Sequence, residues 1–560
     1  MRYYSKIIIL SFFFLALCSC KNSLTKTSEG HAVVSAKVEA TQAGIKILKM
    51  GGNAFDAMIA TDLALAVVYP NAGNIGGGGF MVYRTKDSEY GTLDFREKAP
   101  LASTKNMFLD NNGEIINLQS SVGALSVGVP GTISGLFSVY RKFGSIPLDS
   151  IFEPALKLAK KGFKLTKRQA KLFNENKNKI LFNSDSASVF QKKFKEGDIF
   201  KNIELYKTLK LILKNGEAAF YNGKISNEII NYLSKKGGIL TKEDFIKYKS
   251  IWRTPYTFRF NDLKITTMGL PSSGGVLLHQ ILKSIELFSN KKFTKRDLNY
   301  MKTLLELEKL SFSDRSKFLG DPDFYNTDFI DSITSEKYLL NRINLIDINN
   351  PKPSKDIFPG KMILNESNET THYSILDKYG NAISVTTTLN SNFGSKIFIP
   401  SLGFFLNNEM DDFSIKPGYP NIYGMIGGEI NSIEPEKRML SSMTPTIIEK
   451  NNKLSMILGS PGGPTIITTV LQTILNVNLF DDNLIDAVNR PRFHHLWLPD
   501  KVYYEKGAFS KSDIDSLKKI GYLLNKKPSL IGRVNAIYIN SEGKITAAAD
   551  FRGDDFAFSE

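Results

Sequence analysis

The chain has 560 residues, 42% of them hydrophobic and 23% charged, which is ordinary for a globular protein whose core needs no staples. The formal net charge of +16, from 72 basic and 56 acidic residues, would suit nucleic acid or an acidic surface. The lysines are scattered, however, with no long basic run and no basic–aromatic repeat. We therefore expect a solvated, lysine-rich surface and no nucleic-acid partner.

Residues 1–20 are predicted to be a lipoprotein signal region. Two basic residues precede an apolar run from Ile7 to Leu17 that is too short to cross a bilayer as a helix. The run ends in Leu17-Cys18-Ser19-Cys20, which is similar to a bacterial lipoprotein signal with Cys20 as the lipidated residue. The alternative is a plain cleaved signal peptide with incidental cysteines. We expect an exported bacterial protein, periplasmic or on the cell surface, anchored to a membrane through Cys20.

The first globular elements are predicted from residue 33. Residues 33–36 resemble a strand, and apolar spacing predicts helices over 40–50 and 54–68. Four glycines, Gly76 to Gly79, precede an apolar strand. No Gly-Lys-Ser/Thr follows them, so they are not a phosphate-binding loop, and we expect them to let backbones pack closely.

Helices dominate the middle of the chain. Residues 147–249 and 297–319 have helical patterns, and a further apolar helix opened by residues 271–275 contains His279, a type of position where histidine usually serves packing. After residue 370 short strands prevail, followed by helices over 466–477 and 482–489 and paired strands over 534–553.

A breaker-rich segment runs into a predicted β-hairpin at Thr370. Residues 372–376 and 382–390 are strand-like and are joined by a turn at 377–381. By local pattern this is an ordinary loop-to-hairpin junction. A second interpretation is that the chain is cut between Glu369 and Thr370. Thr370 would then carry a free α-amine beside its own hydroxyl, which is a nucleophile with a built-in base.

The order of motifs after the hairpin favours the second interpretation. With Thr-Thr-His-Tyr-Ser at residues 370–374, the chain resembles the gamma-glutamyltransferase (gamma-glutamyl transpeptidase) family of N-terminal-nucleophile hydrolases. Each motif alone is weak, and the resemblance depends on all of them in order, beginning upstream at Val33. The other motifs are Asn407–Phe413, Pro420–Gly424, Arg438–Thr446 and Gly459–Gly463.

The resemblance implies an α+β fold, a four-layer αββα sandwich built from two autoproteolytic pieces. These are a large subunit, residues 21–369, and a small catalytic subunit, residues 370–560, which associate as a heterodimer. The implied activity is that of a gamma-glutamyltransferase and glutathione hydrolase. Thr370 would form an acyl-enzyme with glutathione or another gamma-glutamyl compound and pass it to water or to an amino-acid or peptide acceptor. No cofactor is implied.

The resemblance also implies the roles of individual residues. Thr388 would hydrogen-bond the nucleophile, and the N–H groups of Gly462 and Gly463 would form the oxyanion hole. A gamma-glutamyl group carries a free α-carboxylate and a free α-ammonium, so the site needs groups of both signs. The carboxylate is assigned to Arg96, Ser441 and Ser442, the ammonium to Asn390, Glu409 and Asp412, and the lid to Tyr423 in the loop 417–428.

Two alternatives stay open against this interpretation. A glutaryl or cephalosporin acylase of the same fold would have no use for an ammonium-binding acid such as Asp412. An inactive periplasmic binding lipoprotein would not need Thr370. The adjacent His494 and His495 suggest a metal site. However, side chains next to each other in sequence do not face one site, as histidines at i and i+4 of a helix do. We therefore predict no metal site.

Overall fold

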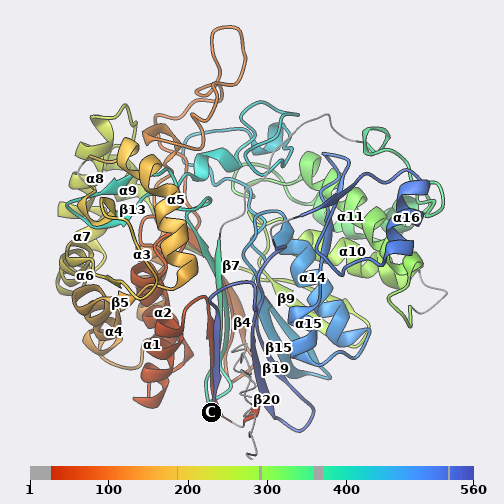
Figure 1. The fold of residues 1–560 in the computed structure, drawn as a ribbon, viewed down its shortest axis with the longest axis horizontal. Coiled ribbons are helices and arrows are strands. Elements are labelled where there is room, and N and C mark those ends of the chain that lie inside the picture. The colour runs from red at the N-terminus through yellow and green to blue at the C-terminus, as the bar shows by residue number, and fades with distance from the viewer. Residues whose placement is uncertain (1–26, 29, 186, 289–292, 359–369, 528–529) are drawn as a thin grey trace, which may run out of the picture.

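The computed structural model describes residues 27–28, 30–185, 187–288, 293–358, 370–527 and 530–560. The signal region 1–20, Cys20 and Glu369 lie outside these ranges, so the roles predicted for them stay predictions. Within the described residues, two seven-stranded sheets lie face to face at the centre of the molecule, with helices on both outer sides (Figure 1). The predicted four-layer α+β sandwich is confirmed.

The first sheet carries the hairpin that follows Thr370. Its order is β21-β2-β10-β11-β3-β4-β7, and all its neighbouring strands are antiparallel. Its strands are β2 (Ala32–Ser35), β3 (Gly78–Arg84), β4 (Tyr90–Asp94), β7 (Ile251–Arg253), β10 (Thr371–Leu376), β11 (Ala382–Thr388) and β21 (Phe556–Ser559).

The second sheet has the order β1-β20-β19-β15-β14-β9-β8, again antiparallel throughout. Each sheet mixes strands from before and after residue 370, so neither part of the chain could complete a sheet alone. The strands are β1 (Thr27–Ser28), β8 (Tyr256–Phe260), β9 (Leu263–Thr267), β14 (Thr446–Lys450), β15 (Lys453–Gly459), β19 (Asn535–Ile539) and β20 (Ile545–Ala549).

One helix layer covers the outer face of the first sheet and comes from the first half of the chain (Figure 1). Its innermost helix, α2, is buried along its whole length and is capped by the Asn53 side chain, which accepts from two backbone N–H groups. The layer consists of α1 (Val38–Lys49), α2 (Ala54–Val68), α3 (Thr132–Phe143), α4 (Leu148–Lys161), α5 (Lys167–Asn183), α6 (Ile203–Asn215), α7 (Ala218–Tyr221), α8 (Lys224–Ser234) and α9 (Lys242–Lys247).

The other helix layer covers the second sheet and contains helices from before and after residue 370. It consists of α10 (Gly274–Phe288), α11 (Leu298–Phe318), α12 (Phe329–Thr334), α13 (Glu336–Ile343), α14 (Thr465–Asn478), α15 (Leu484–Asn489) and α16 (Lys511–Lys519). Short paired strands complete the described part: β5 (Phe163–Lys164), β6 (Ile199–Phe200), β12 (Phe398–Ile399), β13 (Phe404–Phe405), β16 (Phe493–His495), β17 (Val502–Tyr504) and β18 (Leu524–Lys526).

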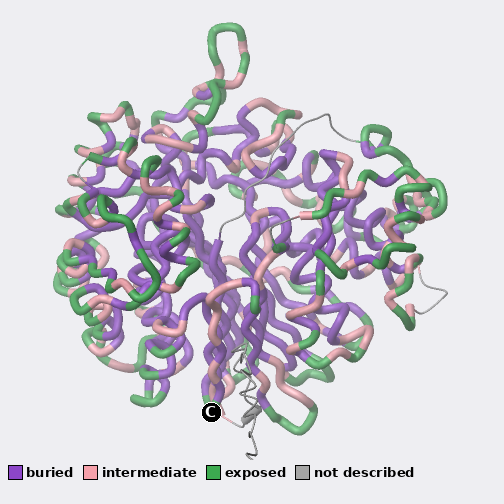
Figure 2. The backbone as a smooth tube through the Cα atoms, viewed as in Figure 1, coloured by how far each residue is buried: buried purple, intermediate pink, exposed green. Residues whose placement is uncertain are grey.

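Two hydrophobic cores follow from the alternation of side chains along the first sheet. Val33 and Met81 pack with helices α1–α9, while the next residues along their strands, Val34 and Val82, pack between the sheets. Both faces of this sheet are therefore buried, as the purple centre of Figure 2 shows. Among the described residues, no helix has the length and hydrophobicity that a membrane crossing requires.

The glycine run before β3 brings backbones together, as predicted. A Cβ on Gly77 would lie 2.1 Å from the carbonyl oxygen of Thr388, and one on Gly79 would lie 2.4 Å from that of Thr386. Any side chain here would push β3 away from β11. The run therefore fixes the end of β11, where Thr388 lies.

Candidate active site

The hydroxyl of Thr370 meets that of Thr388 at the end of the hairpin. Thr370 stands one residue before β10, which begins at Thr371 and not at Thr370 itself. Its Oγ1 lies 3.5 Å from Thr388 Oγ1. Thr388 Oγ1 also accepts the backbone N–H of Asn390 at 2.7 Å, so its own proton is free to point at Thr370. The register of β10 against β11 thus presents one threonine to the other.

Both threonines open onto a pocket that collects most of the predicted site residues. Gly462 is not part of its wall, but its neighbour Gly463 is. The wall also includes residues to which the sequence analysis gave no role, above all Arg315 and Asn421. The lining is Arg96, Arg315, Thr370, Thr388, Asn390, Glu409, Asp412, Phe413, Ser414, Asn421, Tyr423, Met425, Gly427, Asn431, Ser441, Ser442, Met443, Gly463, Pro464 and Ile466.

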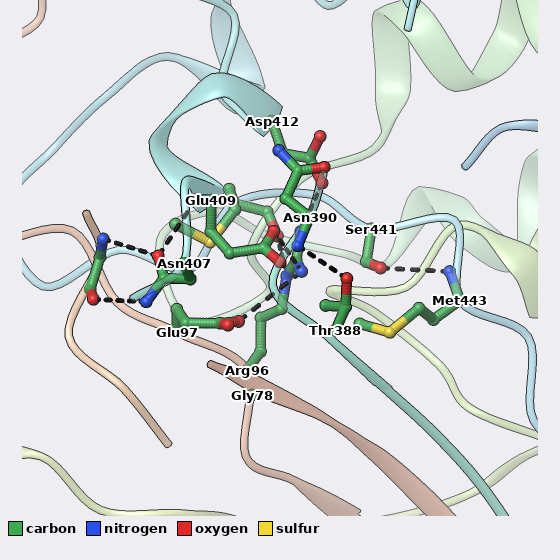
Figure 3. A network of polar contacts seen from close by, with 12 residues as sticks. Gly78, Arg96, Glu97, Thr388, Asn390, Asn407, Glu409, Asp412, Ser441 and Met443 are labelled. Atoms are coloured by element: carbon green, nitrogen blue, oxygen red, sulfur yellow. Dashed lines mark hydrogen bonds and ion pairs between the residues drawn. The ribbon is translucent and has the colours of Figure 1, made fainter. Parts of the chain in front are cut away.

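Arg96 lies between two carboxylates at the buried end of the pocket (Figure 3). One terminal nitrogen is 2.6 Å from Glu409, and the other donates to Asp412 at 2.6 Å. A third acid, Glu97, lies 3.7 Å from the same guanidinium. Burial alone would lower the pKa of Arg96, but Glu409, Asp412 and Glu97 raise it above its ordinary value. Arg96 is therefore a permanent cation whose end groups are already paired with acids.

The acids around Arg96 are hard to ionise. Burial raises the pKa of Glu97 to about 8 and that of Glu409 well above its usual value, although Arg96 opposes both shifts. Burial likewise raises the pKa of Asp412, against the pull of Arg96. Apart from the ion pairs with Arg96, the oxygens of Glu97 and Glu409 have no hydrogen-bond donor among the described residues. This set of carboxylates could therefore still accept hydrogen bonds from a bound cation.

The segment that carries Glu409 and Asp412 is held by the amide of Asn407. Its nitrogen donates to the carbonyl oxygens of Gly76 and Gly128, both at 2.9 Å, and its oxygen accepts the N–H of Gly128 (Figure 3). A single side chain therefore joins the glycine run, the approach to α3 and the acidic segment, which explains how residues far apart in sequence reach one pocket.

Ser441 and Ser442 lie on a loop that is hydrogen-bonded to the residue before α10. The Ser441 carbonyl accepts both the N–H and the hydroxyl of Ser273, at 2.8 and 2.7 Å. Ser273 Oγ in turn accepts Arg315 Nε at 2.9 Å. The Ser441 hydroxyl accepts the N–H of Met443 at 3.1 Å and keeps its own proton for another acceptor (Figure 3).

Gly462 and Gly463 form the tight turn between β15 and α14. Both have positive φ angles, 136° and 53°, which favour glycine. Within the part of the chain that the structure describes, neither N–H has a hydrogen-bond acceptor. Two adjacent free N–H groups at the start of a helix could stabilise an oxyanion.

Tyr423 closes one side of the pocket. Its hydroxyl donates to the carbonyl oxygen of Asn390, and its ring lies over Gly463, where an added Cβ would be 3.1 Å from the ring. Two hydrogen bonds tie the segment around Tyr423 to the acids. Asn421 Nδ2 donates to Asp412 at 3.1 Å, and the Ile422 N–H donates to Asp411 at 2.9 Å.

The adjacent histidines serve separate structural contacts. His494 Nδ1 lies 2.9 Å from Thr468 Oγ1, whereas His495 Nε2 is 3.3 Å from Asp500. Burial lowers the pKa of both. In the described ranges, no group of three or more histidine, cysteine, aspartate or glutamate side chains is placed to hold a metal ion.

A sandwich of two antiparallel sheets between helix layers, with a threonine hydroxyl at the start of an inner strand, is the architecture of N-terminal-nucleophile hydrolases. Residues 40–559 match the gamma-glutamyltranspeptidase family. The chain belongs to that family and is an enzyme of it.

Three known proteins illustrate the relationship. The glutathione hydrolase proenzyme of Escherichia coli (strain K12) is 43% identical over 527 residues, which cover 93% of this chain and 90% of that protein. The gamma-glutamyltranspeptidase of Helicobacter pylori has a solved structure with a TM-score of 0.57 and 38% identity, covering 61% of this chain and 98% of that one. A cephalosporin acylase from Bacillus halodurans, at 22% identity and a TM-score of 0.83 over 99% of both chains, shares the fold.

Proposed function

We propose that this enzyme is a self-processing gamma-glutamyltransferase and glutathione hydrolase with Thr370 as its nucleophile. The observation that carries the proposal is the contact of Thr370 with Thr388, at 3.5 Å, in a pocket lined by both cations and acids. Glutathione hydrolase is also the name of the Escherichia coli relative. The activity of a glutaryl or cephalosporin acylase is less favoured, because a glutaryl group has no ammonium to pair with Glu409 and Asp412.

The enzyme first cuts itself between Glu369 and Thr370. The Thr370 hydroxyl attacks the carbonyl carbon of Glu369, the C–N bond breaks, and the acyl group is held as an ester. Breaking the C–N bond frees the α-amine of Thr370, which takes the hydroxyl proton. Water then hydrolyses the ester, which restores the Thr370 hydroxyl and leaves Glu369 as a carboxylic acid. The pieces, 21–369 and 370–560, remain together as a heterodimer, since both sheets contain strands from each piece.

In the mature enzyme the α-amine of Thr370 takes the proton of its own hydroxyl, since an unperturbed amine pKa near 8 suits general-base catalysis. The hydroxyl oxygen attacks the gamma-carbonyl carbon of the donor. The N–H groups of Gly462 and Gly463 stabilise the oxyanion, and the departing amine takes the proton. Water, or the amine of an amino acid or peptide, then attacks the acyl-enzyme and releases Thr370.

The charged groups of the pocket orient the glutamyl donor. Its α-carboxylate lies against the hydroxyls of Ser441 and Ser442 and the guanidinium of Arg96. Its α-ammonium is received by the amide of Asn390 and the carboxylates of Glu409 and Asp412. Because this ammonium brings positive charge, its arrival lowers the pKa of Glu409 and Asp412, which burial raises. Tyr423 covers the bound group and limits the access of water.

The proposal extends to the cellular location. Export and anchoring through lipidated Cys20 rest on the signal-like residues 1–20, which lie outside the described part of the structure. Mass spectrometry of the mature N-terminus tests this point, and a product that begins past Cys20 without lipid would refute the anchor alone.

The decisive experiment compares Thr370→Ala with Thr371→Ser. Thr371 is buried beside the nucleophile in sequence but does not line the pocket, so it is a matched control. We expect the parent and Thr371→Ser to be cut before residue 370, as N-terminal sequencing reports, and to release glutamate from glutathione. An added dipeptide acceptor should yield the transfer product. Thr370→Ala should stay uncut and inactive. An active, uncut parent chain would contradict the proposal.

A further inference from the structure

Arg315 is a buried guanidinium in the pocket wall that forms no ion pair with any residue the structure describes. It lies on α11, is 6% exposed and lines the same pocket as Thr370. Its Nε donates to Ser273 Oγ at 2.9 Å. Among the described residues, its side chain has no other hydrogen bond and no ion pair. Its two terminal nitrogens are therefore available to a ligand.

Arg96 differs in this respect, although both arginines line one pocket. The terminal nitrogens of Arg96 are bound to Glu409 and Asp412, and its Nε donates to the Met439 carbonyl oxygen at 3.4 Å. A carboxylate that reached Arg96 would have to share its nitrogens with two acids. A carboxylate that reached the terminal nitrogens of Arg315 would displace none of the described residues from them.

A buried charge without an ion-pair partner destabilises the fold, so the position of Arg315 needs an explanation. Removing a guanidinium from water costs several kcal/mol unless an anion compensates. Burial lowers the pKa of Arg315 to about 9; Asp412 partly opposes this shift and Arg96 adds to it. A group kept in this state beside a reaction site is better explained by a ligand than by folding.

The position of Arg315 indicates what that ligand is. Ser273 connects its Nε to the Ser441 carbonyl, so the guanidinium is fixed beside the loop that carries Ser441 and Ser442. The Ser441 hydroxyl has a proton to donate, and Ser442 also lines the pocket. A guanidinium next to hydroxyl donors is a typical binding site for a carboxylate.

We propose that Arg315 binds a carboxylate of the substrate through its terminal nitrogens, beside Ser441 and Ser442. The inference rests on the proposed function and adds a second guanidinium to its carboxylate site. The carboxylate has two possible sources: the α-carboxylate of the gamma-glutamyl donor, and the carboxylate of the amine that leaves, as in the glycine end of glutathione. Arg96 keeps its place at the donor carboxylate and, through its two ion pairs, also holds Glu409 and Asp412 for the ammonium.

The experiment measures the preference for a carboxylate over the matching amide in two substrate pairs. The first pair is gamma-glutamyl anilide and its α-carboxamide, which differ at the donor. The second pair is glutathione and its glycine amide, which differ at the leaving group. The variants are Arg315→Gln, which removes the charge, and Arg315→Lys, which keeps it. Arg342→Gln is the matched control, because Arg342 is also largely buried but pairs with Asp314 at 2.8 Å and does not line the pocket.

We expect the parent to prefer the carboxylate in at least one pair by about 10- to 100-fold in kcat/KM, mainly through KM. Arg315→Gln should reduce that preference to about threefold or less, and Arg315→Lys should restore part of it. Arg342→Gln should leave it unchanged. A loss in the first pair assigns the donor carboxylate, and a loss in the second assigns the leaving group. A purely structural role would slow all four substrates alike.

An unchanged preference in both pairs for a fully self-cleaved Arg315→Gln enzyme would overturn the proposal. If Arg315→Gln fails to fold, Arg315→Lys decides the matter, since its shorter reach should raise KM for the carboxylate member of a pair and spare the amide. Equal effects on both members would again overturn it. Failure of the proposed function looks different, because the parent itself would then not hydrolyse glutathione.

Discussion

Two buried ion networks in this enzyme contain similar residues but differ in how many hydrogen-bond donors their carboxylates have. The C-terminal network consists of Arg492, Glu505, Asp550 and Arg552. The pocket network consists of Arg96, Glu97, Glu409 and Asp412. In the C-terminal network each carboxylate oxygen accepts two N–H donors; for example, Asp550 accepts from the side chain of Arg492 at 2.8 Å and from the N–H of Val534 at 2.9 Å. In the pocket network, apart from the ion pairs with Arg96, the oxygens of Glu97 and Glu409 have no hydrogen-bond donor among the described residues.

The pKa values of the acids differ between the two networks in the same way. Burial would raise the pKa of Asp550, but Arg492 and Arg552 hold it below its usual value. Burial raises the pKa of Glu409 and Asp412 in spite of Arg96. A completed network stabilises the fold and needs nothing further, whereas an incomplete one has capacity left for a ligand. This difference separates structural from functional charge, and each variant below tests it at one residue.

The largest effect is expected from Arg552→Met in the C-terminal network. The change leaves Glu505 and Asp550 buried without their shared cation, which should cost about 3–5 kcal/mol of stability. Thermal unfolding measures it as a much lower midpoint. Lys207→Ala removes an exposed ion pair with Glu204 and should change stability by less than about 0.5 kcal/mol. Equal midpoints for the two variants would remove the structural role of the network.

A buried acid that forms no ion pair with any described residue extends the comparison. Asp62 on α2 accepts the hydroxyl of Tyr373 at 2.7 Å, and burial raises its pKa from 3.8 to about 7 despite that bond. The folded state thus keeps a proton that the unfolded chain loses near pH 4. Stability therefore falls as pH rises from about 4 to about 7 and then levels off, a total of about 4 kcal/mol.

Asp62→Asn should remove this pH dependence, because the amide oxygen still accepts from Tyr373 but does not titrate. Unfolding midpoints should be measured between pH 4 and pH 8. The midpoint of the variant should rise relative to that of the parent up to about pH 7, and the difference between them should stay constant above that pH. A constant difference over the whole range would mean that Asp62 is ionised in the folded protein.

Asp412→Asn tests the pocket network with a smaller expected effect. It keeps the shape and removes one charge that would face the ammonium, so kcat/KM for gamma-glutamyl donors should fall by about 2–3 kcal/mol in transition-state terms. Activity on a glutaryl analogue, which lacks the ammonium, should fall much less. The unfolding midpoint should stay near that of the parent. Equal losses on both donors, with normal self-cleavage, would reopen the acylase interpretation.

The parts of the fold that depend on sequence neighbours could be predicted. The helix at 54–68 follows from its apolar run and the proline after it, and the hairpin after Thr370 follows from its turn residues. The sequence around Thr370 by itself favours an ordinary loop-to-hairpin junction. The prediction that Thr370 is the nucleophile depends on the order of motifs that lie far from it in sequence.

The charge arrangement of the site could not be predicted either. Arg96 and Asp412 are 316 positions apart, and only the folded chain shows that they bind each other. The feature that singles out Arg315 is the lack of an ion pair with any described residue, which no local pattern reveals. Glu97 follows Arg96 directly, but its importance depends on burial that its neighbours in sequence do not indicate.

The smallest effect is expected at the edge of the pocket, from Tyr423→Phe. The change leaves the ring over Gly463 and removes the hydroxyl with its hydrogen bond to the Asn390 carbonyl oxygen, which should cost about 1 kcal/mol or roughly fivefold in kcat/KM. Tyr423→Ala also removes the ring that covers the pocket, so it should increase hydrolysis at the expense of transfer to an acceptor amine. Product ratios with glutathione and a dipeptide acceptor measure this. The lid role would be wrong if Tyr423→Ala kept the ratio of the parent, because a residue that limits the access of water cannot be removed without favouring water as the acceptor.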